Sequence, residues 1–173
     1  IEHVEMKGPA DAKNQVFANS KTDWTMCIDS HVLFPADVIP KVMKEIQSLF
    51  QPDLYSGPMI MNNGDHSTHM DKQWRGHAWG IWRQDQSVLN SKYPVKVWGQ
   101  GCGLLLCHTK NWLGFSEDFN GFGGEEGYIH EKYRLNNREF FILPYLRWWH
   151  RFGNPDVKHY NITLYSLSLI HIS

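Results

Sequence analysis

The residues with the clearest capacity for chemistry are Asp29 and His31, which end an apolar run and flank Ser30. In an extended segment, residues i and i+2 point the same way, so this carboxylate and this imidazole lie on one side. Carboxylate oxygen combined with imidazole nitrogen suits Mn²⁺ or a similar borderline cation. The alternative is a surface Asp-Ser-His that caps the following turn, and this segment alone leaves both interpretations open.

A second polar group is the pair of adjacent carboxylates Glu125 and Glu126, which follow Gly123 and Gly124 at the start of a predicted helix. Acidic residues in a first helical turn are stabilised by the helix dipole, which is the structural interpretation. The functional interpretation is a carboxylate directed into a cleft, where glycines let a substrate approach the backbone.

Histidines supply two further candidates. His150 follows a predicted strand and lies among aromatic residues, where a structural histidine is the alternative to a ligand. His66 and His69 could bind a second metal, but without a third ligand they are more typical of a polar loop.

The long segment 53–86 is predicted to hold a short strand followed by a polar and aromatic loop. Trp74, His77, Trp79 and Trp82 in this loop could form an acceptor platform by stacking and hydrogen bonding. Packing of the same side chains onto the core is the other interpretation.

Helices and strands alternate around these residues, which indicates the α/β class. Pro9 and the alanines after it favour a helix within 8–22, and Pro40 lies in the first turn of a helix within 35–50. The other predicted elements are a buried strand in 23–30, a buried strand at 104–107, a helix from about residue 125, and a strand that ends at Pro144 before a turn with His150.

Composition indicates a globular chain, because 42% of the 173 residues are hydrophobic and 20% are charged. A formal net charge of −1, without blocks of like charge, gives no support for a nucleic-acid or anionic-membrane partner. Three cysteines, none in a C-x-x-C pair, argue against a disulfide framework and fit a reducing compartment. No run has the length of a membrane span.

The two ends of the chain lead to a domain prediction. Residues 1–165 are predicted to be one catalytic domain that is incomplete at its N-terminus, because the chain begins with Ile1 rather than Met. Residues 166–173 resemble a translated adapter read-through, and we predict that they are a non-native tail.

Taken in order, the polar motifs resemble those of GT-A glycosyltransferases. In detail they are most similar to polypeptide N-acetylgalactosaminyltransferases and related family 2-like transferases. That family has an Asp-Ser-His metal motif, a Trp-Gly-Gly-Glu-Asn segment and an Ile-x-Pro-Cys-Ser-Arg-x-x-His segment. The matching positions here are Asp29-Ser30-His31, Phe122-Gly123-Gly124-Glu125-Glu126 and Ile142 to His150, with Gly101-Cys102-Gly103 at a small-residue turn and Ala12-Lys13-Asn14 where many GT-A enzymes have Ala-Arg-Asn.

The resemblance implies a GT-A-like, Rossmann-like sheet flanked by helices, and transfer of a sugar from a nucleotide-sugar donor, expected to be UDP-linked, to a glycan or protein hydroxyl. Asp29, His31 and His150 would hold Mn²⁺ or another divalent metal against the donor diphosphate. The residues assigned to donor or acceptor binding are Lys13, Gly101, Gly103, Gly123, Gly124, Trp79 and Trp82.

One departure from the family pattern affects the expected mechanism. Glu126 stands where the N-acetylgalactosaminyltransferases have Asn, and inverting GT-A enzymes commonly have an acidic catalytic base there. Glu126, with Glu125 beside it, is therefore the predicted base, and inversion is the favoured outcome. No candidate lectin domain is visible, so the acceptor need not be a polypeptide.

Two other functions remain open on the sequence. A metal-dependent hydrolase could use Asp29, His31 and His150 to activate water, and it would need no nucleotide-sugar. A non-catalytic sugar-binding fragment would bind carbohydrate through its tryptophans after chelation of any metal.

Overall fold

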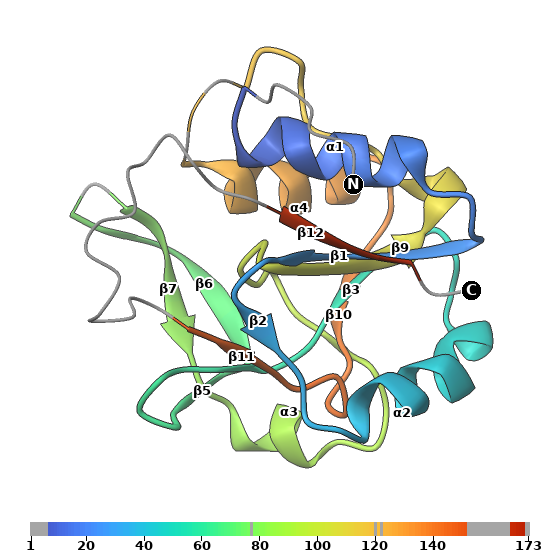
Figure 1. The fold of residues 1–173 in the computed structure, drawn as a ribbon. Coiled ribbons are helices and arrows are strands. Elements are labelled where there is room, and N and C mark those ends of the chain that lie inside the picture. Colours follow the sequence, from blue (N-terminus) through green and yellow to red (C-terminus); the bar gives the residue numbers. More distant parts are fainter. Residues whose placement is uncertain (1–6, 77, 120, 122, 152–166, 172–173) are drawn as a thin grey trace.

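A mixed sheet of six strands forms the middle layer of the fold (Figure 1). The computed structural model describes residues 7–76, 78–119, 121, 123–151 and 167–171, with the backbone alone for 78, 79 and 167–171. Across the sheet the strand order is β12 (Leu167–His171), β1 (Trp24–Asp29), β9 (Leu104–His108), β3 (Leu54–Ser56), β10 (Phe140–Ile142) and β8 (Val95–Lys96). The predicted α/β class with helices flanking a sheet is confirmed.

The central strands β1 and β9 are antiparallel, with Cys27 opposite Leu105 and Thr25 opposite Cys107. Every residue of β9 is buried, which explains its uninterrupted apolar sequence. Strands covered on both faces need no polar alternation. The predicted strands in 23–30 and at 104–107 are therefore confirmed.

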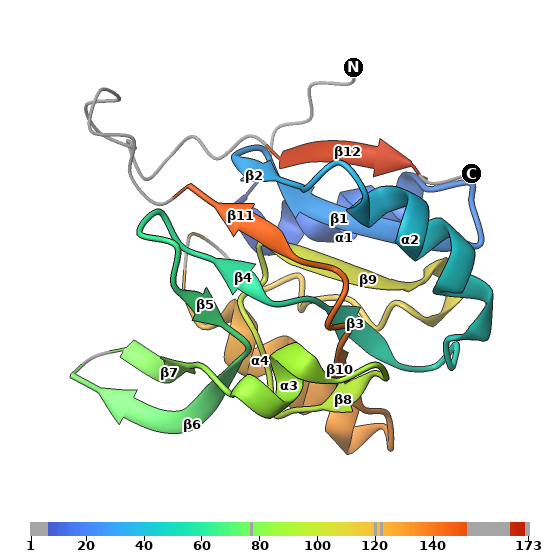
Figure 2. The same cartoon turned by 90° about the horizontal axis from the view of Figure 1, so that it is seen from below.

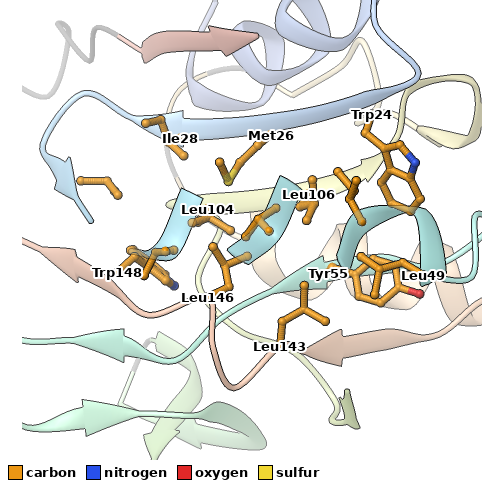
Figure 3. Close-up of a cluster of buried hydrophobic side chains, with 14 of the residues drawn as sticks. Trp24, Met26, Ile28, Leu49, Tyr55, Leu104, Leu106, Leu143, Leu146 and Trp148 are labelled. Carbon is orange, nitrogen blue, oxygen red and sulfur yellow. The ribbon is translucent and has the colours of Figure 1, made fainter. Parts of the chain in front are cut away.

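Helices cover both faces of the sheet. On one face, α1 (Pro9–Asn19) and α4 (Glu125–Leu135) pack with a cluster that includes Cys27, Leu105 and Ile129. On the other face, α2 (Val38–Glu45) packs on a second cluster, which includes Met26, Leu106 and Trp148 (Figure 3). Adjacent residues such as Met26 and Cys27 thus point to opposite cores.

A second, smaller sheet contains four short strands in the order β2 (Val32–Leu33), β11 (Trp148–His150), β4 (Met59–Ile60) and β5 (His66–Ser67). Figure 2 shows β11 between β2 and β4. The expectation that His150 lies in a turn is wrong, because His150 ends β11 and pairs with Val32 of β2. Trp148, two residues before His150 in the same strand, is fully buried, which anchors the strand in the core.

The segment 53–86 is not the long loop that was predicted after its first strand. It also contains β4, β5 and a hairpin of β6 (His69–Arg75) and β7 (Ala78–Arg83), and it ends in α3 (Gln86–Asn90). Gly76 has φ +60° at the end of the hairpin, a conformation that glycine adopts without a steric penalty. Cross-strand hydrogen bonds therefore order a stretch whose local composition is typical of loops.

The predicted helix within 35–50 is shorter than expected. Helix α2 ends at Glu45 and is followed by a 3₁₀ turn, η1 (Ile46–Ser48), and Phe50 beyond this turn is 67% exposed. A second 3₁₀ turn, η2 (Thr109–Asn111), follows β9. Among the described helices, none combines the length and the apolar character needed to cross a membrane.

At the edge of the main sheet, β12 pairs antiparallel with β1, with Cys27 opposite Leu169. This strand lies within residues 166–173, for which a non-native origin was predicted. Pairing does not report the origin of a segment, so that prediction and the domain boundary at residue 165 stay predictions.

Candidate active site

Asp29 is the last residue of β1 and lies where the strand leaves the main sheet. Its backbone N–H donates a hydrogen bond of 2.9 Å to the carbonyl of Gly103, which holds this strand end against the turn before β9. Its side chain is 20% exposed. The carboxylate is thus fixed at its backbone and still accessible to a ligand.

The pairing of β2 with β11 brings His31 and His150 together, although 119 residues separate them in the sequence. Their Nε2 atoms are 2.8 Å apart and their rings are perpendicular, with centroids 4.3 Å apart. The Nε2 of His150 is 4.0 Å from Oδ2 of Asp29. One ligand atom from each of the three residues lies within 4.8 Å of the others.

Both imidazoles of this group are kept neutral. Burial lowers the pKa of His150 to about 4, and the neighbouring His31 lowers it further while Asp29 opposes the shift. Burial also lowers the pKa of His31. Neutral imidazole nitrogens with a carboxylate oxygen form a suitable donor set for a divalent cation, so the residues fit the predicted metal.

Lys13 lies beneath this group rather than at its surface. The side chain is 4% exposed, and its Nζ is 3.5 Å from Oδ1 of Asp29. Burial alone would lower the pKa of Lys13, but the negative charge of Asp29, with a smaller contribution from Glu126, raises it above its usual value. Lys13 is therefore a buried cation paired with Asp29.

The two glutamates at the start of α4 differ in their surroundings. Glu125 is 3% exposed, and its Oε2 accepts a hydrogen bond of 2.7 Å from the N–H of Gly123. Its Oε1 is buried and has no hydrogen-bond partner within the described ranges. Glu126 accepts a longer contact of 3.5 Å from the N–H of Cys102, and burial raises its pKa.

Gly123 and Gly124 have φ values of +114° and +89°, which disfavour any other residue. Apart from the adjacent residues, no atom of the described chain lies within 4 Å of the position where either glycine would carry a Cβ. These two glycines therefore shape an open backbone turn directly before Glu125.

Gly101 and Gly103 make room for aromatic side chains. A Cβ on Gly101 would lie 2.5 Å from the indole of Trp82. A Cβ on Gly103 would lie 3.1 Å from Trp148 and 3.2 Å from the ring of His150. The glycine turn before β9 thus allows the hairpin and β11 to pack close to Asp29.

Some of the residues that the sequence suggested do not join the cluster of Asp29, His31 and His150. His69 forms a hydrogen bond of 2.9 Å with the hydroxyl of Thr68, and its Nε2 lies 3.5 Å from Oδ1 of Asp71. In the part of the chain that the structure describes, Asp29, His31 and His150 form the single cluster of three or more possible metal ligands. His66 in β5 and His69 in β6 gain no third ligand that would form a second cluster of this kind within the described residues. Trp74 is 68% exposed, whereas His77 and the side chain of Trp79 fall outside the described residues.

The ion pair of Lys13 with Asp29 was not predicted from the sequence. A signal for it exists, because Lys13 is three residues from both Ala10 and Val16, on the buried face of α1. A lysine on an apolar helix face needs a partner of opposite charge. The approach of His31 to His150 has no comparable local signal.

Comparison with known proteins identifies the family. No curated protein matches the chain. The family model described as Glycosyl transferase family 2 matches residues 1–142, a span that contains Asp29, His31 and both glutamates. A match over more than half of the chain, on a mixed sheet flanked by helices, shows that this protein belongs to glycosyl transferase family 2 and is a glycosyltransferase, with an activated-sugar donor and an acceptor.

Proposed function

We propose that the protein transfers a sugar from a UDP-linked donor to a hydroxyl group of a glycan or protein, in a reaction that depends on Mn²⁺ or another divalent metal. The observation that carries this proposal is the convergence of Asp29, His31 and His150 within 4.8 Å in a family 2 domain. Family membership favours transfer over the metal-dependent hydrolysis that the sequence left open.

Asp29, His31 and His150 are the proposed ligands. Their donor set of one carboxylate and two neutral imidazoles supports this assignment. A bound divalent cation would neutralise the charge that develops on the leaving nucleoside diphosphate. The motif Asp29-Ser30-His31 and the motif from Ile142 to His150 bring their ligand side chains together here. This contact supports the proposed similarity to polypeptide N-acetylgalactosaminyltransferases.

Glu126 is the proposed catalytic base. The acceptor hydroxyl would give its proton to this carboxylate while its oxygen bonds to the anomeric carbon, and the bond from that carbon to the diphosphate oxygen would break. A single displacement of this kind inverts the configuration. The raised pKa of Glu126 supports the role, because it makes the carboxylate a stronger base.

Glu125 and the glycines have separate proposed roles. Oε1 of Glu125, buried without a partner in the described structure, would accept a hydrogen bond from a sugar hydroxyl. Gly123 and Gly124 would let the donor approach the backbone, and Gly101, Gly103, Trp79 and Trp82 keep their proposed donor or acceptor contacts. Lys13 would contribute its charge to donor binding from beneath Asp29.

Calorimetric titration of UDP, with Mn²⁺ and again with EDTA, tests the proposal. The wild type is expected to bind UDP only with Mn²⁺, and His31→Ala should lose this binding because one of three ligands is missing. His66→Ala is the matched control, since His66 lies in β5 outside the cluster. Equal binding of UDP in EDTA would contradict a metal-dependent site.

The remaining alternative, a sugar-binding fragment without activity, makes the opposite prediction. Its carbohydrate binding would survive EDTA, and no UDP would be released from any UDP-sugar in the presence of acceptor. Release of UDP that needs both Mn²⁺ and an acceptor would exclude it.

A further inference from the structure

The turn before β9 contains three glycines, Gly99, Gly101 and Gly103, and each of them lies against an aromatic ring of another segment. None of the three has a positive φ, so an alanine fits the backbone conformation at each position. What glycine supplies here is space, because a Cβ at any of the three would approach a neighbouring ring to 3.1 Å or less. The turn thus sets how closely other parts of the fold approach β9.

Gly103 contacts the two strand ends that carry proposed metal ligands. Its carbonyl accepts the 2.9 Å hydrogen bond from the N–H of Asp29 at the end of β1. A Cβ on Gly103 would lie 3.1 Å from two carbons of the Trp148 indole and 3.2 Å from Cδ2 of His150, both in β11. Asp29 and His150 therefore approach each other across a residue that has no side chain.

Trp148 has little room to move away from a methyl group at this position. It is fully buried in the core cluster of Figure 3, and its Nε1 donates a hydrogen bond of 2.8 Å to the carbonyl of Gly57. His150 is less constrained, because it is the last residue of β11 and its side chain is 14% exposed. A methyl group at residue 103 would therefore displace the imidazole of His150.

A displacement of this imidazole changes the arrangement of the donor atoms. Carbon atoms in contact are about 3.5–4.0 Å apart, so a methyl group 3.2 Å from the ring forces a shift of a few tenths of an ångström. Distances from ligand to metal vary by only about 0.2 Å. Nε2 of His150, now 4.0 Å from Oδ2 of Asp29, would thus move by more than a shared cation tolerates.

We infer that Gly103 is a positioning residue of the proposed metal site. The absence of a side chain at this position sets how closely His150 approaches Asp29, and with it the affinity for a divalent cation. The inference rests on the proposed function, because it takes Asp29, His31 and His150 as the metal ligands. It adds a role in metal binding to the donor or acceptor contacts proposed for Gly103.

Calorimetric titration of Mn²⁺ alone into wild-type protein and Gly103→Ala tests this role. Gly103→Ala is expected to bind Mn²⁺ at least about tenfold more weakly, because outer residues that orient a ligand have effects of this size. The visible absorption of bound Co²⁺ is the second readout, since its spectrum depends on the geometry of the ligands. The spectrum should differ between the two proteins, which a loss of stability alone would not cause.

Gly99→Ala is the matched control. It introduces the same methyl group in the same turn, but its Cβ would lie 2.9 Å from Nδ1 of His130, which is not a proposed ligand. The Mn²⁺ affinity of this variant should stay within about twofold of the wild type, with an unchanged Co²⁺ spectrum. Thermal unfolding in EDTA shows whether each variant is folded.

A double variant shows whether residue 103 acts through His150. In EDTA, Gly103→Ala should lower the midpoint of thermal unfolding by less in a His150→Ala background than in the wild type, because the methyl group then fills space that the ring has left. If Gly103→Ala alone does not fold, the double variant is expected to fold for the same reason. Trp148 is present in both backgrounds, so its own contact with the methyl group cancels in the comparison.

Three outcomes would overturn the inference. The first is an unchanged Mn²⁺ affinity in folded Gly103→Ala, and the second is an equal weakening in Gly99→Ala. The third is an equal effect of Gly103→Ala on unfolding in both backgrounds, or a double variant that stays unfolded. Folded wild-type protein that binds no Mn²⁺ would contradict the proposed metal site itself and the inference with it, so the two failures are distinguishable.

Discussion

At the scale of single residues, the two glutamates of α4 have different surroundings despite being adjacent. The carboxylate of Glu125 accepts a 2.7 Å hydrogen bond from the N–H of Gly123, whereas the contact of Glu126 with the N–H of Cys102 is longer, at 3.5 Å, and burial raises the pKa of Glu126. A base must be free to receive a proton, so the less committed carboxylate is the better candidate.

The variant Glu126→Gln tests this assignment. Release of UDP from UDP-sugars in the presence of acceptor should fall at least about 100-fold, because the amide cannot accept the acceptor proton. Binding of UDP with Mn²⁺ should stay within about twofold of the wild type, since no proposed ligand is changed.

Glu131→Gln is the matched control, an exposed acid on the same helix whose surface ion pair with Arg134 contributes little stability. Full activity of Glu126→Gln, or an equal loss in Glu131→Gln, would contradict the proposed base.

Lys13 is the second residue with a distinct test. Lys13→Met keeps the length of the side chain and removes the charge that faces Asp29. The free energy of unfolding should fall by roughly 1–3 kcal/mol, because a partly buried carboxylate loses its partner. Urea denaturation measures this change, with the exposed Lys21→Met as control. An unchanged free energy of unfolding would show that the ion pair adds no stability.

At the scale of elements, α4 carries the candidate base at its start and a buried histidine one turn later. Nδ1 of His130 donates a hydrogen bond of 2.6 Å to the carbonyl of Glu126, and its ring packs against Phe140 of β10. Burial lowers the pKa of His130 to about 4. The helix is thus locked to the sheet through a neutral imidazole.

This histidine makes the stability of the fold depend on pH. Its folded pKa of about 4 lies below the unfolded value of 6.5, so between these values the unfolded chain binds more protons and protonation favours unfolding. Stability contributed by neutral His130 is therefore present above about pH 6.5 and is lost as the pH falls toward 4.

His130→Gln retains a donor for the carbonyl of Glu126 and does not titrate. Between pH 7 and pH 4.5 its free energy of unfolding should decline less than that of the wild type, by on the order of 2 kcal/mol. Urea denaturation at the two pH values measures the difference, to which the other histidines contribute equally in both proteins. Parallel declines in the two proteins would contradict the assignment.

The elements differ in how far local sequence predicted them. The predictions agree with the structure for α1, β1, β9 and the start of α4. Each of these elements has either an apolar run long enough to show a pattern or a Gly or Pro residue that marks its boundary. Strands β2, β4, β5, β8 and β11 have two or three residues each, too few for any periodicity. Their formation depends on hydrogen bonds to distant strands.

At the scale of the whole molecule, the order of motifs along the chain was sufficient to indicate the family and to select Asp29, His31, His150, Glu125 and Glu126 as candidates. These are properties of residue type and spacing, which a sequence contains in full. The α/β class was likewise determined, because alternating apolar runs and polar helices allow few other layer arrangements.

Only the tertiary structure decided which candidates meet. Two histidines 119 residues apart approach to 2.8 Å because β2 pairs with β11, and Lys13 is found beneath Asp29 because α1 packs under the end of β1. Such contacts arise from chain packing over long separations, and the residue types at each position do not contain that information locally.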